Sequence, residues 1–454
     1  MAFGFFKKAA AADLVLYNGK FITQESDSDD ITAVACADGK IVSAGSYEDM
    51  EELIDEETLT VDLQGKFVLP GFVDIFSSPV TEVFKDRYAD LSRCGDLQSL
   101  YSHVKLFADE NPDCEVIFGY GYSEKLLLEA NSDYQEAIRD EELMRKIMKM
   151  LDEACPDRPV ILLCENTVSC LLNTAASDTV KETAEEEMVQ YITVPYILNL
   201  MIPFDFEALE QDVRSQIEKM NRHGFTAALD LGVPDYFEDL YIDSLISFYN
   251  EEVLHQRFFG SYLMNRPLMP DGLVHRLMAR KTQCNEIGDY INANALYIEL
   301  NGEACPLDFS QDALNSIMTR VSDKGFSIFI SAAGMDDYLM AYNAVEYIRS
   351  KGCQGLVAIR STHKSDSLAN EFVHWESAAK LPSFSDISSM TSEELIDLLT
   401  AEAAALTGTE QFIGTIRKGK FADMAVFDRD PFKMSPEELL CQPVSMTIFN
   451  GKII

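Results

Sequence analysis

Strand-like and helix-like segments alternate through the middle of this chain, and this order limits the folds that it can adopt. Stretches such as 206–222 and 312–324 carry apolar residues at three- and four-residue spacing, which is typical of helices. The runs that resemble strands are 72–78, 115–122, 159–165, 225–231, 257–264, 295–300, 326–332 and 356–361. Because parallel strands need long crossover connections, usually helices, the pattern predicts an α/β fold, most simply a TIM-like (β/α)8 barrel.

Both ends of the chain instead consist of short strand-like runs and tight turns. Three dipeptides that favour positive φ predict two-residue hairpins: Asn18-Gly19, Asp38-Gly39 and Asn450-Gly451. A strand-rich N-terminal segment cannot bury its face alone, and C-terminal strands can complete it. We therefore expect a β-sandwich built from residues 1–70 and 411–454, around a barrel at 71–410 with an insertion at about 90–200.

The charge and the cysteine content of the chain indicate which binding partners and which cellular compartment to expect. Acidic residues number 76 and basic residues 37, which gives a formal net charge of −39. Such a surface repels phosphate backbones and anionic lipid headgroups, so we expect neither nucleic-acid nor membrane binding. No apolar run reaches the ~18 residues of a membrane span, and the first twenty residues do not resemble a secretory signal. The ten cysteines include no Cys-x-x-Cys pair, which favours reduced thiols in a cytoplasmic protein.

The stretch Leu69-Pro70-Gly71-Phe72-Val73-Asp74 resembles the start of the barrel in the amidohydrolase superfamily. There, a β-sandwich strand leads through a Pro-Gly turn into the first barrel strand. Three stretches are similar to the branch called amidohydrolase 3, which includes N-substituted formamide deformylases: 89–92, 119–122 and 156–160. IGTIRKGKFADM (413–424) is similar to the returning C-terminal strand. The resemblance implies a hydrolase of non-peptide C–N bonds with one or two divalent metals.

The metal ligands of that family are replaced in this sequence. The family carries His-x-His on its first barrel strand, because residues i and i+2 of a strand face the same way. Phe76 and Ser78 stand at those two positions. By the same resemblance, Tyr297 takes the place of a metal-binding lysine, and Ser331 takes the place of a histidine.

Two further family positions lie on other strands. Asn166 and Thr167 stand where a substrate-side histidine is expected. Arg360-Ser361-Thr362-His363 resembles the family's Arg-x-Glu-His, which leaves His363 as the one retained histidine. The family's final Gly-Ser-Asp loop has no counterpart, and few residues separate His363 from the helix expected at 391. The barrel is therefore either open or completed by the extra runs 115–122 and 159–165.

One histidine cannot supply the three or four ligands of a catalytic zinc. Without the ion, nothing lowers the pKa of water from ~15.7 to about 7, so conventional hydrolysis is not expected. We expect no metal or other cofactor, and we interpret the chain as a degenerate family member that binds a small molecule or a protein partner. The vestigial pocket would be lined by Phe76, Ser78, Asn166, Thr167, Tyr297, Ser331 and His363.

Two active alternatives remain open at this stage. In the first, an atypical metal site uses at least three of Asp74, Asp230, Glu299 and His363 within about 2.0–2.3 Å of one ion. In the second, a metal-free hydrolase uses His363 and a carboxylate. His363 and Asp230 are the candidate catalytic residues. However, a lone histidine at a strand end is more often a packing residue, and Asp230 equally suits a turn cap.

Overall fold

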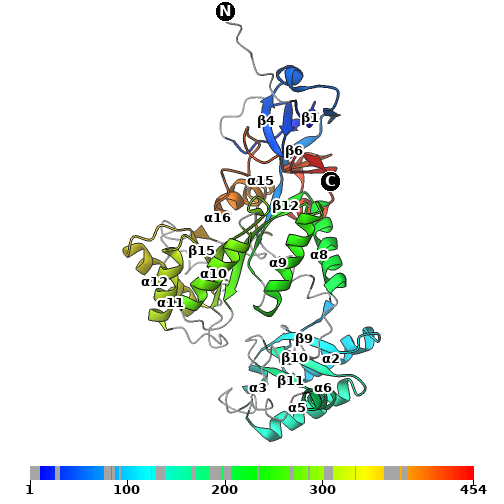
Figure 1. The fold of residues 1–454 in the computed structure, drawn as a ribbon, viewed down its shortest axis with the longest axis vertical. Helices are drawn as coiled ribbons and strands as arrows, with labels where there is room; N and C mark the ends of the chain where they lie inside the picture. The colour runs from blue at the N-terminus through cyan, green and yellow to red at the C-terminus, as the bar shows by residue number, and fades with distance from the viewer. Residues whose placement is uncertain are drawn as a thin grey trace, which may run out of the picture.

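A parallel sheet in the strand order β17-β16-β15-β14-β13-β12-β7 lies at the centre of the molecule in the computed structural model (Figure 1). Every neighbouring pair in it is parallel. The structure describes residues 11–25, 31–75, 83, 87–91, 94–123, 125–128, 137, 139–164, 169–183, 197, 206–232, 235–264, 270–284, 287–300, 310–332, 334–361, 379–380, 387 and 389–454.

The strands of the central sheet follow one another in sequence. They are β7 (Phe72–Asp74), β12 (Phe225–Asp230), β13 (Arg257–Met264), β14 (Ile291–Leu300), β15 (Ser327–Ala332), β16 (Val357–Ser361) and β17 (Ala379–Lys380). The helices between them are α8 (Phe206–Asn221), α9 (Asp235–Asn250), α10 (Pro270–Cys284), α11 (Gln311–Ser322) and α12 (Met335–Ser350). The predicted alternation of parallel strands and helices is confirmed.

The central sheet curls like half of a barrel, and its edge strands β7 and β17 do not pair with each other among the described residues. Side chains alternate between its two faces. Leu296 and Ile298 of β14 share a hydrophobic cluster with α10, α11 and α12, on what we call the helix-covered face. Tyr297 between them belongs to a different cluster, together with Phe329 and Ala358 of the next two strands. We call this opposite side the inner face.

A helical segment after the sheet contacts β7. It runs through α15 (Ser392–Asp397), a π-helical turn η5 (Leu398–Glu402) and α16 (Ala403–Thr407). The predicted capping box is confirmed, because Thr391 Oγ1 accepts a hydrogen bond from the Glu394 amide while Glu394 accepts one from the Thr391 amide. Gly408, with φ +69°, ends the segment as expected for a C-terminal glycine.

The two extra strand-like runs do not complete the barrel. They form β9 (Ile117–Tyr122) and β10 (Val160–Cys164) of a separate sheet, in the order β11-β10-β9-β8. The rest of this unit comprises β8 (Ala89–Asp90), α2 (Leu97–Glu110), α3 (Lys125–Leu128), α5 (Glu141–Ala154), β11 (Cys170–Leu172) and α6 (Thr174–Thr183). Of the two alternatives for the barrel, completion by these runs is therefore wrong: they belong to the insertion at the bottom of Figure 1.

Arg158 binds together the parts of this insertion. Its Nη2 donates a hydrogen bond to the carbonyl of Ala108 (2.7 Å), and its Nη1 donates to those of Asn111 (2.7 Å) and Cys114 (3.0 Å). These carbonyls lie at and just beyond the C-terminal end of α2, where the helix lacks acceptor partners of its own. The arginine of the Pro-Asp-Arg-Pro stretch is thus a structural cap.

Two further sheets are built from the ends of the chain. One contains β1 (Leu14–Tyr17), β3 (Ala33–Ala37), β4 (Lys40–Gly45) and β5 (Leu59–Asp62). The other contains β2 (Lys20–Phe21), β6 (Phe67–Pro70), β18 (Met424–Phe427), β19 (Met446–Phe449) and β20 (Lys452–Ile453). Short helices η1 (Glu48–Leu53), η6 (Pro431–Lys433) and α17 (Pro436–Cys441) flank them. Strand β6 pairs antiparallel with β18, so the expectation that the two ends meet is confirmed.

Two of the three predicted hairpins are confirmed. Asp38 and Asn450 have φ of 50° and 51°, each followed by a glycine with positive φ, between strands that pair. The prediction at Asn18-Gly19 is wrong. There the chain leaves β1 in one sheet and enters β2 in the other, where β2 pairs in parallel with β6. A turn dipeptide marks a change of direction but does not determine which sheet the next strand joins.

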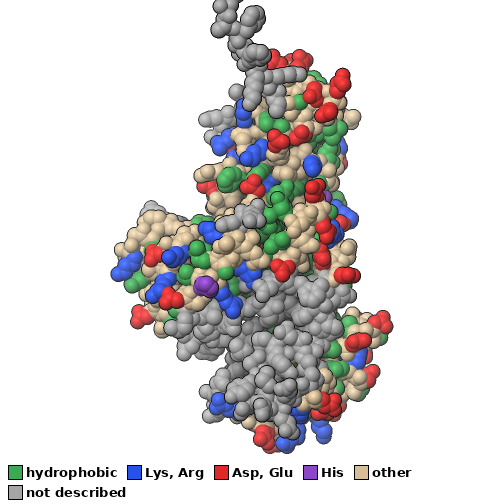
Figure 2. Space-filling model, in the orientation of Figure 1, with side chains coloured by type: hydrophobic (Ala, Val, Ile, Leu, Met, Phe, Trp, Pro, Cys, Tyr) green, Lys and Arg blue, Asp and Glu red, His purple; other side chains and the backbone are tan. Residues whose placement is uncertain are grey.

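The acidic character of the chain is spread over its surface. On the face shown in Figure 2, acidic side chains lie over the terminal sheets, the central helices and the insertion, with basic ones among them. Within the described ranges, no helix combines the length and apolar character that crossing a bilayer requires.

Candidate functional site

Three polar residues form a row across the inner face. In the register of the sheet, Glu299 of β14 pairs with Ser331 of β15, and Ser331 pairs with Arg360 of β16. Paired residues of neighbouring parallel strands face the same side, and each of the three is the penultimate residue of its strand. The row therefore lies at the carboxyl end of the sheet, where active sites of barrel folds are found.

Tyr297 connects two members of this row. Its hydroxyl donates a hydrogen bond to Glu299, two residues further along the strand, and accepts one from Ser331. Burial raises the pKa of Tyr297 far above its ordinary value, and the negative charge of Glu299 raises it further. The charge of Arg360 and the hydrogen bond from Ser331 act in the opposite direction and offset only part of the effect. Tyr297 is therefore a neutral phenol.

Arg360 extends from the row to the other end of the sheet. Its Nη2 donates a hydrogen bond of 2.9 Å to the carbonyl oxygen of Ile75. Ile75 directly follows β7, which is the opposite edge strand of the sheet. This hydrogen bond therefore connects β16 to the end of β7, across the side of the sheet where no described strands pair.

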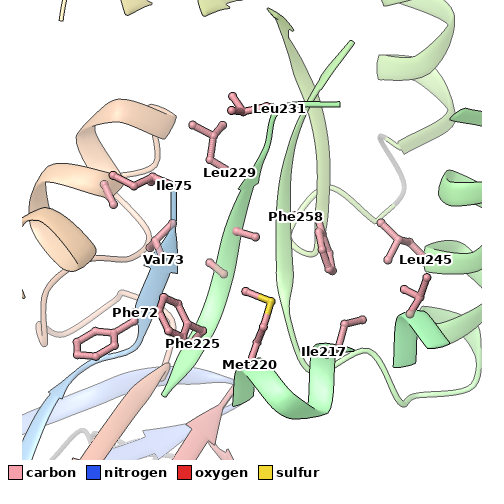
Figure 3. Close-up of a cluster of buried hydrophobic side chains, with 14 of the residues drawn as sticks. Phe72, Val73, Ile75, Ile217, Met220, Phe225, Leu229, Leu231, Leu245 and Phe258 are labelled. Atoms are coloured by element: carbon pink, nitrogen blue, oxygen red, sulfur yellow. The ribbon is translucent and has the colours of Figure 1, made fainter. Parts of the chain in front are cut away.

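Asp74 and Asp230 lie on the helix-covered face, away from this row. Asp74 is in register with Ala228, and Asp230 follows two residues later on the same side of β12. Asp230 lines a cavity of about 30 Å³ together with Ile242 of α9 and Arg280 of α10, which is room for about one water molecule. Figure 3 shows that the side chains near β12 lie on two opposite sides of the sheet: Leu229 lies on one side, and Phe258 and Leu245 lie on the other.

The carboxylate of Asp230 has a structural role in the turn that follows. Its Oδ1 accepts a hydrogen bond of 2.9 Å from the amide of Gly232. Asp230 is 1% exposed, so this carboxylate is deeply buried. This is the turn-capping role that the sequence left open beside a catalytic one.

The structure brings together Tyr297 and Ser331 of the predicted pocket and adds Glu299 to them. The carboxylates of the predicted atypical metal site do not meet. Asp74 and Asp230 share one side of the sheet, where Asp230 lines the cavity beside α9 and α10, whereas Glu299 lies on the inner face. Within the described ranges, no group of three or more His, Cys, Asp or Glu side chains could hold a metal ion. The other predicted pocket residues lie outside the described residues: Phe76, Ser78, Asn166, Thr167 and His363.

Arg360 is the member of this site that reading the sequence missed. It belongs to the motif Arg360-Ser361-Thr362-His363, whose resemblance to the family points to the histidine. The sequence offers one sign of its role, because a charged residue follows the apolar run Val357-Ala358-Ile359. Side chains of a strand point alternately to opposite faces, which places Arg360 on the same face as Ala358.

The sequence model of the amidohydrolase family (Amidohydro_3) matches residues 59–372 and 384–454. The chain belongs to the amidohydrolase family. Among characterised protein sequences, YtcJ of Bacillus subtilis, which is named an amidohydrolase, is 29% identical over 165 residues, which are 36% of this chain. The aligned part spans only 28% of YtcJ.

Two solved structures match nearly the whole chain. An uncharacterized metal-dependent hydrolase from Pyrococcus horikoshii matches with a TM-score of 0.58 and 14% identity, over 93% of this chain and 99% of that one. One from Pyrococcus furiosus matches with a TM-score of 0.55 and 15% identity, over 92% and 100%. At this level of identity, the likeness establishes a shared fold.

Proposed function

We propose that this amidohydrolase-family protein has lost the metal centre of its relatives and serves as a binding or scaffold module for a small molecule or a protein partner. The observation that carries the proposal is the polar row on the inner face. Tyr297, at the position of a metal-binding lysine, is a neutral phenol engaged by Ser331 and Glu299. Neutral hydroxyls are poor zinc ligands compared with imidazole, thiolate or carboxylate.

The described residues therefore do not suit a divalent cation at this place. Glu299 is the one anionic ligand type in the row, and Arg360 brings a positive charge to the same face. The guanidinium of an arginine is always protonated, so its positive charge repels a metal cation.

The decisive experiment is elemental analysis of the purified, full-length chain by inductively coupled plasma mass spectrometry. We expect zinc, nickel, iron and manganese each to remain far below one equivalent per chain. A metal-dependent relative purified in the same buffers serves as the positive control. About one equivalent of tightly held metal, retained through dialysis against a chelator, would refute the proposal.

We also infer that the central sheet is a (β/α)8-type barrel that has stayed open, and that the two terminal sheets form a sandwich. Support for the sandwich comes from one hydrophobic cluster that includes Leu16 and Val34 of one sheet and Val68 and Met424 of the other. The corresponding division is 1–70, 71–410 and 411–454. A crystal structure in which β17 pairs directly with β7 would contradict the open barrel.

We place the protein in the cytoplasm on its thiol chemistry. Cys36, Cys94, Cys155 and Cys353 are buried and form no disulfide, and reduced cysteines persist in reducing compartments. Fractionation of cells followed by immunoblotting tests this placement, and recovery with secreted or membrane material would contradict it.

A further inference from the structure

Arg360 and Ile75 join the two ends of a sheet that does not close. They lie 285 residues apart in sequence, and the carbonyl of Ile75 accepts a 2.9 Å hydrogen bond from the guanidinium. In the described part of the sheet, β7 has a neighbour only on its β12 side. The bond from Arg360 is therefore a tie across the open side.

The chemistry of this contact suits a permanent tie. Ile75 is fully buried, and a buried carbonyl oxygen needs a donor in place of water. Arginine carries five N–H donors on a rigid plane and stays charged at any physiological pH. A hydrogen bond from a charged donor is also stronger than one between neutral groups.

The positive charge of Arg360 needs compensation on the inner face, and Glu299 is placed to give it. The two residues are separated by one strand, at the same level of the sheet, with Ser331 between them. Tyr297 experiences the charges of both. Long side chains two strands apart, roughly 10 Å between backbones, can approach each other over a small residue such as serine.

We propose that Arg360 is a strap that holds the edge strand β7 to the opposite end of the open sheet, with Glu299 as its internal counter-charge. The strap takes over part of the role that direct strand pairing has in a closed barrel. It does not depend on the proposed loss of the metal centre, because it rests on a contact between backbone and side chain within the protein.

The first test is Arg360→Met, which keeps the aliphatic stem and removes the donors. We expect the ratio of folded to unfolded protein to fall about ten- to hundredfold in urea titrations. Hydrogen–deuterium exchange should quicken most at the amides of β7, whereas those of β3 (Ala33–Ala37) should keep their relative protection. Arg145→Met is the matched control, because Arg145 is 73% exposed on α5 and should change neither readout.

The second test is the cycle of Glu299→Gln, Arg360→Met and the double variant. If Glu299 compensates Arg360, the double variant loses less stability than the two single losses added together. Additive losses of stability would refute the role of Glu299 as the counter-charge of Arg360. Unchanged hydrogen–deuterium exchange at β7 in Arg360→Met would refute the role of Arg360 in holding this strand. Should Arg360→Met not fold, Arg360→Lys replaces it: lysine keeps the charge without the planar fork, so β7 should exchange faster than in the wild type. Metal analysis plays no part in either readout, so failure here is distinct from failure of the proposed function.

Discussion

The guanidinium of Arg257 and the carboxylate of Asp423 form a buried ion pair, with Nε 2.7 Å from Oδ2 and Nη2 3.2 Å from Oδ1. Arg257 opens β13 of the central sheet, and Asp423 immediately precedes β18 of the terminal sheet. Their side chains are 0% and 4% exposed. The centroid of the Phe421 ring lies 3.7 Å from the guanidinium carbon, and the backbone N–H of Asn450 donates a hydrogen bond to Asp423 Oδ1. This buried ion pair therefore links the central parallel sheet to the terminal sheet that contains β18.

Replacing Arg257 with methionine should destabilise the whole molecule. The change leaves the Asp423 carboxylate buried without its partner, a defect that typically costs about 3–5 kcal/mol. Urea unfolding followed by circular dichroism measures the loss. Arg429→Met is the control, because Arg429 pairs with Glu438 on the surface and such pairs contribute about 0–1 kcal/mol. Equal losses in the two variants would contradict the structural role of the buried pair.

Gly232→Ala should cost more stability than Gly65→Ala. Both glycines have positive φ, +91° and +81°, so alanine brings similar backbone strain to each. A Cβ at Gly232 would lie 2.6 Å from the carbonyl oxygen of Ser261 and 2.7 Å from the amide nitrogen of Leu263, whereas one at Gly65 would have open space. We expect Gly65→Ala to cost about 1 kcal/mol and Gly232→Ala at least about 2 kcal/mol more, by thermal or urea unfolding. Similar losses of stability in the two variants would mean that the backbone of β13 shifts at little energetic cost to make room for the Cβ atom.

Stability should fall at alkaline pH, partly through Cys36. Burial, with smaller effects from the charges of Asp13 and Asp423, raises the pKa of this thiol to about 12 from an ordinary value of 9.0. Since the unfolded thiol ionises first, this contribution is complete below pH 9 and is lost between pH 9 and about 12. Unfolding free energies measured across this window should decline less steeply in Cys36→Ala. An identical slope would show that Cys36 ionises in the folded protein as easily as in the unfolded chain.

Arg158→Met should loosen the insertion. The variant leaves the carbonyls of Ala108, Asn111 and Cys114 without their charged donor, and we expect a loss of about 2–3 kcal/mol. Hydrogen–deuterium exchange should locate the effect in α2 before it reaches the central sheet. Exchange that quickened evenly across the chain would instead indicate that the insertion and the central sheet unfold as one unit.

Local patterns predicted six strands of the central sheet, from β7 to β16, but not the short edge strand β17 (Ala379–Lys380). The apolar run 257–264 coincides with β13, and the run 225–231 contains β12. Strand β14 begins at Ile291, earlier than the predicted 295. A register shift between Gly260 and Ser261 interrupts its pairing with β13, and alternation cannot be followed across such an irregularity.

The site was harder to predict, because it depends on which face each side chain takes. Asp74 and Asp230 are strand-end carboxylates in sequence, yet register places them on the helix-covered face. Tyr297 and Ser331 were predicted from resemblance alone, and the structure brings them into contact. The bond from Arg360 to Ile75 joins residues with no local relationship, so only the curl of the sheet reveals it.

The antiparallel pairing of β6 with β18 has a consequence for synthesis on the ribosome. Strand β6, which precedes the central sheet, pairs with a strand that is translated about 350 residues later, since Pro70 lies opposite Met424. Contacts between such distant segments slow folding, and the waiting strand exposes an unpaired apolar edge meanwhile. Nascent chains that stall before β18 are therefore expected to engage chaperones, and a premature stop codon between β6 and β18 to yield an aggregation-prone product.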